Sequence, residues 1–296
     1  SIPGDEWDVD AIEPDAVEAV RDYLATLDDA AFGAASEVTP RLISPSDPAA
    51  QWTGAHKGPA FFAYATNYLV DTANAVIVDV EASRAIRQAE VGAARTMIER
   101  TQEHLGLKPK RLAADTAYGS AANLGWLVKT KKITPHIPVI DKSGRDDGTL
   151  SRADFAFDAE RDVYVCPQGK LLTTTGRVHD GRTRLYRASK FDCDPCPLKS
   201  RCCPKTPQRK IPRDIDEDAR DLARSLAGTP AFEQSRHQRK RALMLFAHLK
   251  RILKLGRLRL RGPCGASDEF LLAATVQNLR KLAKLKPNLP PGLQAA

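Results

Sequence analysis

The chain has 296 residues, of which 42% are apolar, and a formal net charge of +8 at pH 7. This length and apolar content allow one large domain or two modest domains with a real core. No run of eighteen apolar residues occurs, which excludes a membrane-spanning helix. The first thirty residues show no secretory pattern, so we expect a cytoplasmic protein.

The charge is distributed unevenly. Residues 1–40 carry eleven acidic residues and one Arg, a balance of −10, which leaves +18 for residues 41–296. A basic body favours a polyanionic partner, most commonly nucleic acid, although a solvated basic surface that keeps the protein soluble is the alternative. Because the chain begins with Ser-Ile-Pro and not with Met, we also expect an upstream part of the protein to be missing.

The first half of the chain predicts an acidic arm followed by a β-hairpin. Residues 14–30 fit an acidic amphipathic helix, and residues 33–59 are rich in Pro, Ser, Gly and Ala and predict an irregular connection. Residues 61–70 and 75–80 have the composition of two antiparallel strands around a turn. A helix over 86–105 then ends at Gly106.

The second half alternates short strands and helices. A strand that ends at Asp115 precedes a helix over 121–130, and a strand over 133–140 contains two prolines, which favours an edge position. Residues 150–215 read as short β segments with cysteines and basic loops. Two helices follow, at about 216–256, with a restart at Thr229-Pro230, and at 267–285, with Ser267 as the N-cap.

This order predicts a mixed α/β fold that resembles the ribonuclease H type. That fold begins with three antiparallel strands, whereas we predict only two before the first helix, so the first strand is expected to be missing. The expected segments are an acidic arm (1–40), the core (41–150), a small cysteine-rich β insertion (151–215), C-terminal helices that complete the core (216–286) and a disordered tail (287–296).

Asp115 is the strongest catalytic candidate by position. Open α/β sheets carry functional groups at the carboxyl ends of their strands. Transfer of a phosphodiester uses divalent ions held by carboxylates, and Mg²⁺ takes few protein ligands, so these can come from distant parts of the chain. The alternative is that Asp115 merely caps the helix at 121.

The cysteines suggest a zinc site. Four of them have the spacing C-x26-C-x2-C-x5-C, namely Cys166, Cys193, Cys196 and Cys202. Four thiolates bind zinc tetrahedrally and can hold together a segment that has few apolar residues. Redox-active or free thiols are the alternative, Cys203 could replace Cys202, and Cys264 is expected to be unliganded.

The C-terminal helices form a basic stretch with one anomalous position. Residues 229–286 hold fourteen Lys or Arg and three acidic residues. At 100° per residue, one apolar stripe contains Ala242, Leu245, Leu249 and Ile252, and the opposite face contains Arg236, Arg239, Lys250 and Lys254. Leu243 lies within that cationic face, where a carboxylate would satisfy the charges and could reach a metal ion.

The segment Arg257-Leu-Arg-Leu-Arg-Gly262 continues the basic stretch. Its alternation suits a segment with one face on the core and one on phosphate groups. We therefore predict contacts from Arg257, Arg259 and Arg261, together with the cations of the preceding helix, to the DNA backbone.

Several of these motifs resemble bacterial insertion-sequence transposases of the DDE superfamily, in the subgroup with a cysteine-containing insertion. They are Ser44–Ala49, Phe62–Asp71, Ala114–Ser120, Leu260–Gly262 and Gln277–Leu282. The resemblance implies a ribonuclease H-like core, two catalytic Asp and one catalytic Glu, magnesium, cleavage of transposon ends and strand transfer to target DNA, and a dimer or synaptic complex.

The resemblance also implies missing catalytic residues. Asp115 matches the second Asp, and the helix pattern Tyr-x2-Arg-x3-Glu-x6-Lys matches at Arg239 and Lys250, with Arg236 at the Tyr position. Leu243 stands at the Glu position, and Glu233, ten residues earlier, is not a simple replacement. Asp71 and Asp79 are the available substitutes for the first Asp.

We therefore expect a DDE-type transposase domain that is N-terminally truncated, associated with the nucleoid and weak or inactive in catalysis. The alternative is a non-catalytic DNA-binding relic, or an inhibitor of an intact transposase. A zinc-ribbon nucleic-acid module in which Asp115 is structural is a further alternative.

Overall fold

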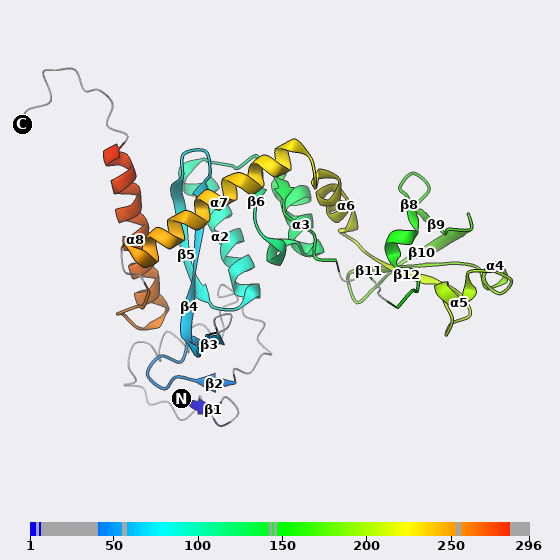
Figure 1. Ribbon diagram of the computed structural model, residues 1–296, viewed down its shortest axis with the longest axis horizontal. Helices are drawn as coiled ribbons and strands as arrows, with labels where there is room; N and C mark the ends of the chain where they lie inside the picture. The colour runs from blue at the N-terminus through cyan, green and yellow to red at the C-terminus, as the bar shows by residue number, and fades with distance from the viewer. Residues whose placement is uncertain are drawn as a thin grey trace, which may run out of the picture. The chain divides into compact units, whose positions relative to one another are not determined.

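The computed structural model describes residues 1–3, 6, 41–54, 58–141, 144, 147–252 and 256–284 (Figure 1). The predicted helix over 14–30, Lys254 and the predicted tail lie outside these residues. The chain divides into two compact units, residues 1–110 with 233–296 and residues 111–232, and each is described by itself. The segment boundaries expected from the sequence stay predictions.

The first unit contains an antiparallel sheet of three strands. They are β3 (Gln51–Gly54), β4 (Ala60–Asp71) and β5 (Val76–Arg84), in the order β3-β4-β5. The predicted hairpin is confirmed, with Tyr64 opposite Arg84. The expectation of only two strands before the first helix is wrong, because β3 pairs with Ala60–Ala63. Two short strands, β1 (Ile2–Pro3) and β2 (Leu42–Ile43), pair separately.

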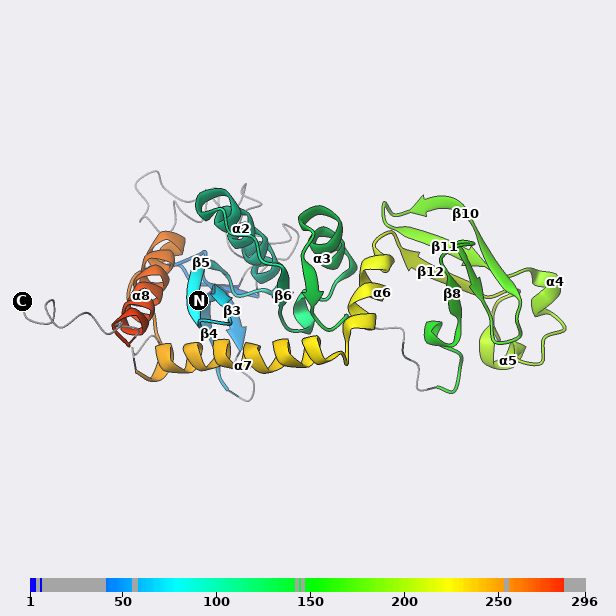
Figure 2. The same cartoon turned by 90° about the horizontal axis from the view of Figure 1, so that it is seen from above.

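Helices α2 (Arg87–Leu105) and α8 (Gly262–Lys284) lie on opposite sides of this sheet (Figures 1 and 2). The predicted end of α2 is confirmed, because Gly106 adopts the left-handed conformation with φ 63°. Helix α8 begins five residues before the predicted cap Ser267. Gly262, with φ 78°, turns the chain and Pro263 occupies the first turn, where its missing N–H costs no helix hydrogen bond.

Amide side chains attach α8 to its neighbours. Asn278 donates to the carbonyl oxygen of Ile77 in β5 at 2.7 Å and accepts from its N–H at 3.0 Å. Gln277 lies 2.7 Å from Nδ1 of His248 in α7 (Pro230–Arg251) and donates to the carbonyl oxygen of Leu245. These bonds satisfy groups that burial would otherwise leave unpaired. An apolar cluster of Ala49, Ala50, Tyr64, Ala82, Ala266 and Phe270 completes this core.

The second unit begins with two parallel strands, β6 (Arg111–Ala113) and β7 (Thr134–His136). A 3₁₀ helix (Thr116–Tyr118) and α3 (Ala121–Gly125), which continues as a π-helical segment to Lys131, connect them. β7 is shorter than the predicted strand, since it ends before Pro138.

The predicted β insertion is a five-stranded antiparallel sheet in the order β12-β11-β10-β9-β8. Its elements are β8 (Ala156–Asp158), β9 (Val163–Val165), β10 (Leu171–His179), β11 (Thr183–Arg187), α4 (Lys190–Cys193), α5 (Lys199–Cys202) and β12 (Lys210–Asp214). Helix α6 (Glu217–Leu226) follows. The predicted mixed α/β class is confirmed. None of the helices described is long and apolar enough to cross a membrane.

Candidate functional site

A large cleft in the first unit lies beside the N-terminal half of β4. Its volume is about 1060 Å³, and consecutive residues from Phe61 to Thr66 line one part of it. Residues 61–63 pair with β3 and residues 64–66 pair with β5, so the cleft lies where β4 passes from one neighbouring strand to the other. Residues 256–261 line another part of the cleft.

The basic segment Arg257–Arg261 is fixed to the core at several points. Leu258 packs against the apolar cluster of the first unit. The N–H groups of Arg259 and Leu260 donate to Oε1 of Glu269 at 2.6 and 2.5 Å. These contacts hold the backbone while the three arginine side chains stay exposed. The predicted alternation is confirmed at Leu258 and is wrong at Leu260, which is 52% exposed.

Asp47 connects the parts of this cleft. Its Oδ1 accepts from the hydroxyl of Tyr64 at 2.6 Å, and its Oδ2 accepts from the N–H of Gly262 at 3.1 Å. Asp47 and Glu90 are the acidic residues that line the cleft, against four cations, Lys250, Arg257, Arg259 and Arg261. We name this cleft, with these four cations, the cationic cleft. Its charge and its aromatic lining residues suit a nucleic acid.

Helix α7 carries the predicted basic face. Arg236 is exposed and pairs with Glu233 at 2.7 Å, Arg239 is half-buried, and Lys250 is exposed at the cationic cleft. The predicted apolar stripe reaches the core at Leu249, which is 2% exposed, but Ile252 is exposed. The structure thus shortens the stripe and leaves cations available on the helix.

Leu243 is 58% exposed on α7. It does not join the core, and the equally apolar Met244 beside it is exposed as well. A leucine at this position gains little from burial and supplies no metal ligand. Its assignment to the position of a catalytic Glu rests on the sequence pattern and stays a prediction.

Asp115 follows β6 and caps the 3₁₀ helix that begins at Thr116. Its Oδ1 accepts from the N–H of Ala117 at 2.9 Å, and its side chain is exposed. The helix at 121 has its own cap, Ser120, so the alternative role of Asp115 as the cap of that helix is wrong. Asp115 and Leu243 belong to different compact units.

The two substitutes for the first Asp have structural partners. Asp71 accepts from the N–H of Ala73 and from Nδ2 of Asn74, and the bond from Asn74 is the main reason that its pKa is lowered. Asp79 forms an ion pair with Arg100 at 2.9 Å. Both carboxylates stabilise the β4–β5 turn or the contact between β5 and α2.

The predicted zinc site is not supported. Within the described residues, no group of three or more His, Cys, Asp or Glu side chains could hold a metal ion. Cys166, Cys193 and Cys202 pack against an apolar cluster of the insertion, and Cys203 is buried. Burial, with a smaller contribution from Cys203, raises the pKa of Cys202 to about 11.

The premise behind the zinc prediction was also wrong. The five-stranded sheet and its flanking segments have an apolar core of their own, made of Leu150, Phe155, Tyr164, Leu172, Tyr186, Ala188 and Ile211. The rings of Phe157, Tyr164 and Tyr186 pack against one another with centroids 4.9 to 5.9 Å apart. These contacts stabilise the sheet.

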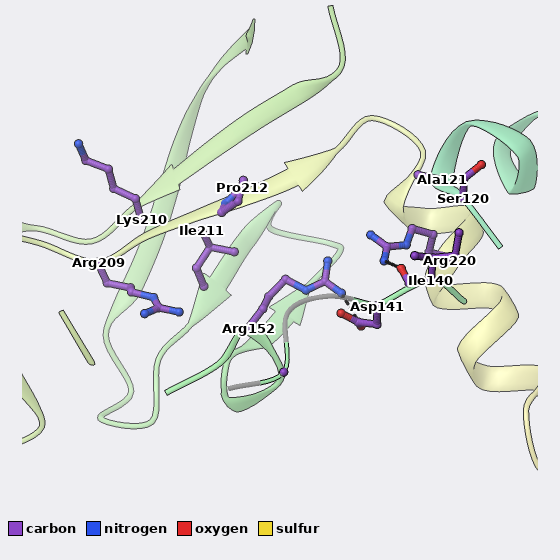
Figure 3. Close-up of a pocket in the computed structure, with 11 residues that line it drawn as sticks. Ser120, Ala121, Ile140, Asp141, Arg152, Arg209, Lys210, Ile211, Pro212 and Arg220 are labelled. Atoms are coloured by element: carbon purple, nitrogen blue, oxygen red, sulfur yellow. Dashed lines mark hydrogen bonds and ion pairs between the residues drawn. The ribbon is translucent and has the colours of Figure 1, made fainter. Parts of the chain in front are cut away.

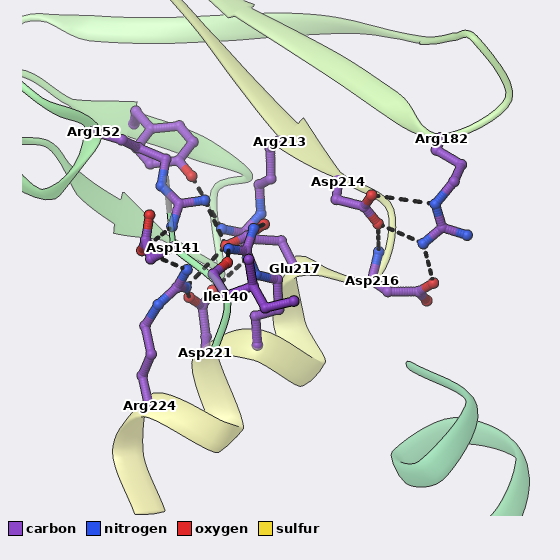
Figure 4. A network of polar contacts seen from close by, with 12 residues as sticks. Ile140, Asp141, Arg152, Arg182, Arg213, Asp214, Asp216, Glu217, Asp221 and Arg224 are labelled. Atoms are coloured by element: carbon purple, nitrogen blue, oxygen red, sulfur yellow. Dashed lines mark hydrogen bonds and ion pairs between the residues drawn. The ribbon is translucent and has the colours of Figure 1, made fainter. Parts of the chain in front are cut away.

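A charged network that the sequence reasoning missed lies at the start of α6 (Figure 4). Glu217 is 1% exposed and contacts Arg152 at 2.5 Å, Arg220 at 2.9 Å and Arg224 at 2.8 Å. Arg224 also contacts Asp141 at 3.1 Å. The spacing of Glu217, Arg220 and Arg224 along one helix face was a visible signal. Arg152 and Asp141 are distant from α6 in the sequence, so no sequence pattern indicated that they belong to the network.

Burial raises the pKa of Glu217, but the hydrogen bond from Arg224 and the charges of Arg152 and Arg220 outweigh it. The net pKa of Glu217 is therefore lowered, and the group is ionised at neutral pH. The network joins segments near 141 and 152 to α6.

Residues 165–283 match a family model described as a transposase DDE domain. The match covers the insertion from the end of β9 and the C-terminal helices, which is less than half of the chain. No curated protein and no solved structure matches the chain. Residues 165–283 are therefore similar to transposase DDE domains, and the mixed α/β fold is consistent with that class.

Proposed function

We propose that the chain is a DNA-binding transposase domain whose metal-dependent cleavage and strand transfer are impaired. The cationic cleft is the observation that carries DNA binding. It combines four cations with two acids, and the backbone of Arg259 is held by Glu269. A fixed backbone lowers the entropic cost of ordering arginines on phosphate groups.

The expected ligands are transposon ends and target DNA, as the family implies. The contacts available in the cationic cleft are guanidinium and ammonium groups, which bind phosphates without reading sequence. Phe61, which is 48% exposed, also lines the cleft and offers a surface for stacking on unpaired bases. DNA binding of this kind supports the expected nucleoid association, and a homodimer or synaptic complex stays part of the proposal.

Impaired catalysis follows from the donors in the candidate catalytic positions. DDE transposases generally use Mg²⁺, which two-metal catalysis holds with several carboxylates. Of the candidates, Asp115 has an exposed carboxylate with one oxygen engaged by Ala117, Leu243 has no donor, and Asp79 is paired with Arg100. This donor set does not fit a two-metal centre, and we derive no catalytic step through one.

The second candidate function is a non-catalytic DNA-binding protein, either a relic or an inhibitor of an intact transposase. The exposed Leu243 on a helix that also carries Arg236, Arg239 and Lys250 favours it, because such a chain retains contacts to DNA without the acid. The two functions differ only in residual cleavage, so a cleavage assay decides between them.

The binding proposal is tested by fluorescence anisotropy with a labelled DNA duplex at several salt concentrations. The double variant Arg257→Gln/Arg259→Gln should bind at least tenfold more weakly, and the slope of log K against log salt should become shallower by about 2. Lys108→Gln/Lys110→Gln, a matched pair of exposed cations outside the cleft, should bind as the parent chain does. Equal affinities for all three proteins would overturn the proposal.

A further inference from the structure

A second pocket lies entirely in the unit of residues 111–232 (Figure 3). Its volume is about 620 Å³. Polar side chains line it. They come from the start of α3, the segment after β7, the segment before β8, the region of β12 and α6. They are Ser120, Asp141, Arg152, Arg209, Lys210 and Arg220, and we name this site the arginine pocket.

The arginine pocket has a surplus of positive charge. Four cations line it, against the single acid Asp141. Asp141 lies 3.5 Å from Arg152 and 3.1 Å from Arg224, so its one negative charge is shared between two guanidinium groups. A metal cation is disfavoured by this charge, and an apolar ligand would leave the cations unsolvated.

The guanidinium groups are held in place before any ligand binds. Glu217 contacts both Arg152 and Arg220, and Arg220 also donates to the carbonyl oxygen of Ile140. Arg209 donates to the carbonyl oxygen of Cys202 at 2.8 Å and lies over the ring of Phe155. In Figure 3 the guanidinium groups of Arg152 and Arg220 point toward each other, and the side chain of Lys210 extends from β12 away from them.

One donor in the network lacks an acceptor. Nε of Arg220 is buried and has no hydrogen-bond partner within the described residues. Buried donors without partners are rare in proteins, and a bound ion or water commonly explains them. Guanidinium groups bind tetrahedral oxyanions with several parallel hydrogen bonds.

From these observations we propose that the arginine pocket binds a phosphate group. The phosphate belongs either to a small molecule, such as inorganic phosphate or a nucleotide, or to the backbone of a nucleic acid. In the second case the inference rests on the proposed DNA-binding function and adds a contact separate from the cationic cleft.

The test uses the full chain and two probes, inorganic phosphate and a labelled single-stranded oligonucleotide. Calorimetric titration measures binding of the first at matched ionic strength, and anisotropy measures binding of the second. Ser120→Asp places a negative charge in the pocket, yet Asp caps helices about as well as Ser, so the fold should persist. Lys210→Gln is a second variant, at an exposed residue, and Lys205→Gln is the control outside the pocket.

We expect Ser120→Asp to weaken binding of at least one probe about tenfold, because like charge opposes the anion, and Lys210→Gln to weaken it about threefold. An effect on inorganic phosphate identifies a small phosphate ligand, and an effect on the oligonucleotide alone identifies a phosphodiester. Unchanged binding of both probes in Ser120→Asp, or an equal loss in Lys205→Gln, would overturn the proposal. The variants in the cationic cleft test the DNA-binding function independently, since they lie in the other unit.

Discussion

Glu217 shows how one side chain can organise a unit of this chain. Its carboxylate is almost completely buried and has three arginine partners. Burying a charge is costly, and the arginines compensate for that cost only while the carboxylate is ionised and in place. The arginine pocket depends on the same contacts, because Glu217 holds Arg152 and Arg220.

Replacing Glu217 by Gln should lower the free energy of unfolding by about 3–5 kcal/mol, because three buried or half-buried arginines lose their shared counter-charge. Urea denaturation at pH 7 measures this change. Glu160→Gln, at an exposed position of the same unit, is the matched control and should stay within about 0.5 kcal/mol of the parent. A loss below about 1 kcal/mol for Glu217→Gln would show that the network does not stabilise the fold.

The stabilisation by Glu217 should also depend on pH. The pKa of Glu217 is lower in the folded state than its ordinary value of 4.5. Its contribution to stability is therefore present above pH 4.5 and is lost as the pH falls through the folded pKa. Urea titrations from pH 7 downward should show the parent chain and Glu217→Gln converging in stability at acidic pH. Parallel curves over the whole range would contradict this assignment.

Leu243 can be tested by restoring a carboxylate. Leu243→Glu should change the free energy of unfolding by less than about 0.5 kcal/mol, because the side chain is exposed and Arg239 is four residues away on the same helix. We expect it to tighten Mg²⁺ binding, measured by calorimetric titration. Met244→Glu adds the same charge to the neighbouring exposed position, about 100° around the helix. Equal Mg²⁺ affinity in the two variants would argue against a catalytic position at 243.

At the scale of elements, the cysteine-rich insertion folds around aromatic and aliphatic side chains. We predict that a metal chelator leaves its unfolding temperature unchanged, because the described thiols form no ligand group and the apolar cluster provides the core. Thermal unfolding followed by circular dichroism, with and without chelator, measures this. A fall in the unfolding temperature together with release of zinc from the chain would restore the zinc prediction.

The sequence predicted the helices and strands that are determined by residues close to one another in the chain. The hairpin over 60–84 has two β-rich strands around a polar turn, and α2 ends at a glycine in the left-handed conformation. The sequence did not predict β3, because Gln51–Gly54 is short and its pairing depends on Ala60–Ala63. The start of α8 was predicted at Ser267, five residues late, although Pro263 in the first turn is compatible with a helix.

The candidate site was predictable only where charge patterns are contiguous. Three arginines in Arg257–Arg261 predicted exposed cations, and the structure adds the anchors Asp47 and Glu269. The cysteine spacing suggested a metal site because spacing along the chain does not fix where thiols point. The contact of Glu217 with Arg152 and that of Arg224 with Asp141 depend on tertiary structure, which no local pattern encodes.

At the scale of the whole molecule, negative charge predominates in the first forty residues and positive charge in the remainder. The balance of −10 in residues 1–40 and +18 in the remainder gives the net +8. The cations available for DNA include those of α7, the cationic cleft and the arginine pocket. Since long-range attraction depends on the total charge and local affinity on the contacts, binding should weaken steeply with salt.

The central claim is that this chain, which resembles DDE transposases, binds DNA through the cationic cleft without cutting it efficiently. The most direct test is an assay of nicking on transposon-end DNA with Mg²⁺, carried out at protein concentrations that saturate binding by anisotropy. We predict full binding by the unaltered chain and no nicking above the protein-free background, with binding lost in Arg257→Gln/Arg259→Gln. Mg²⁺-dependent nicking by the unaltered chain would contradict the account.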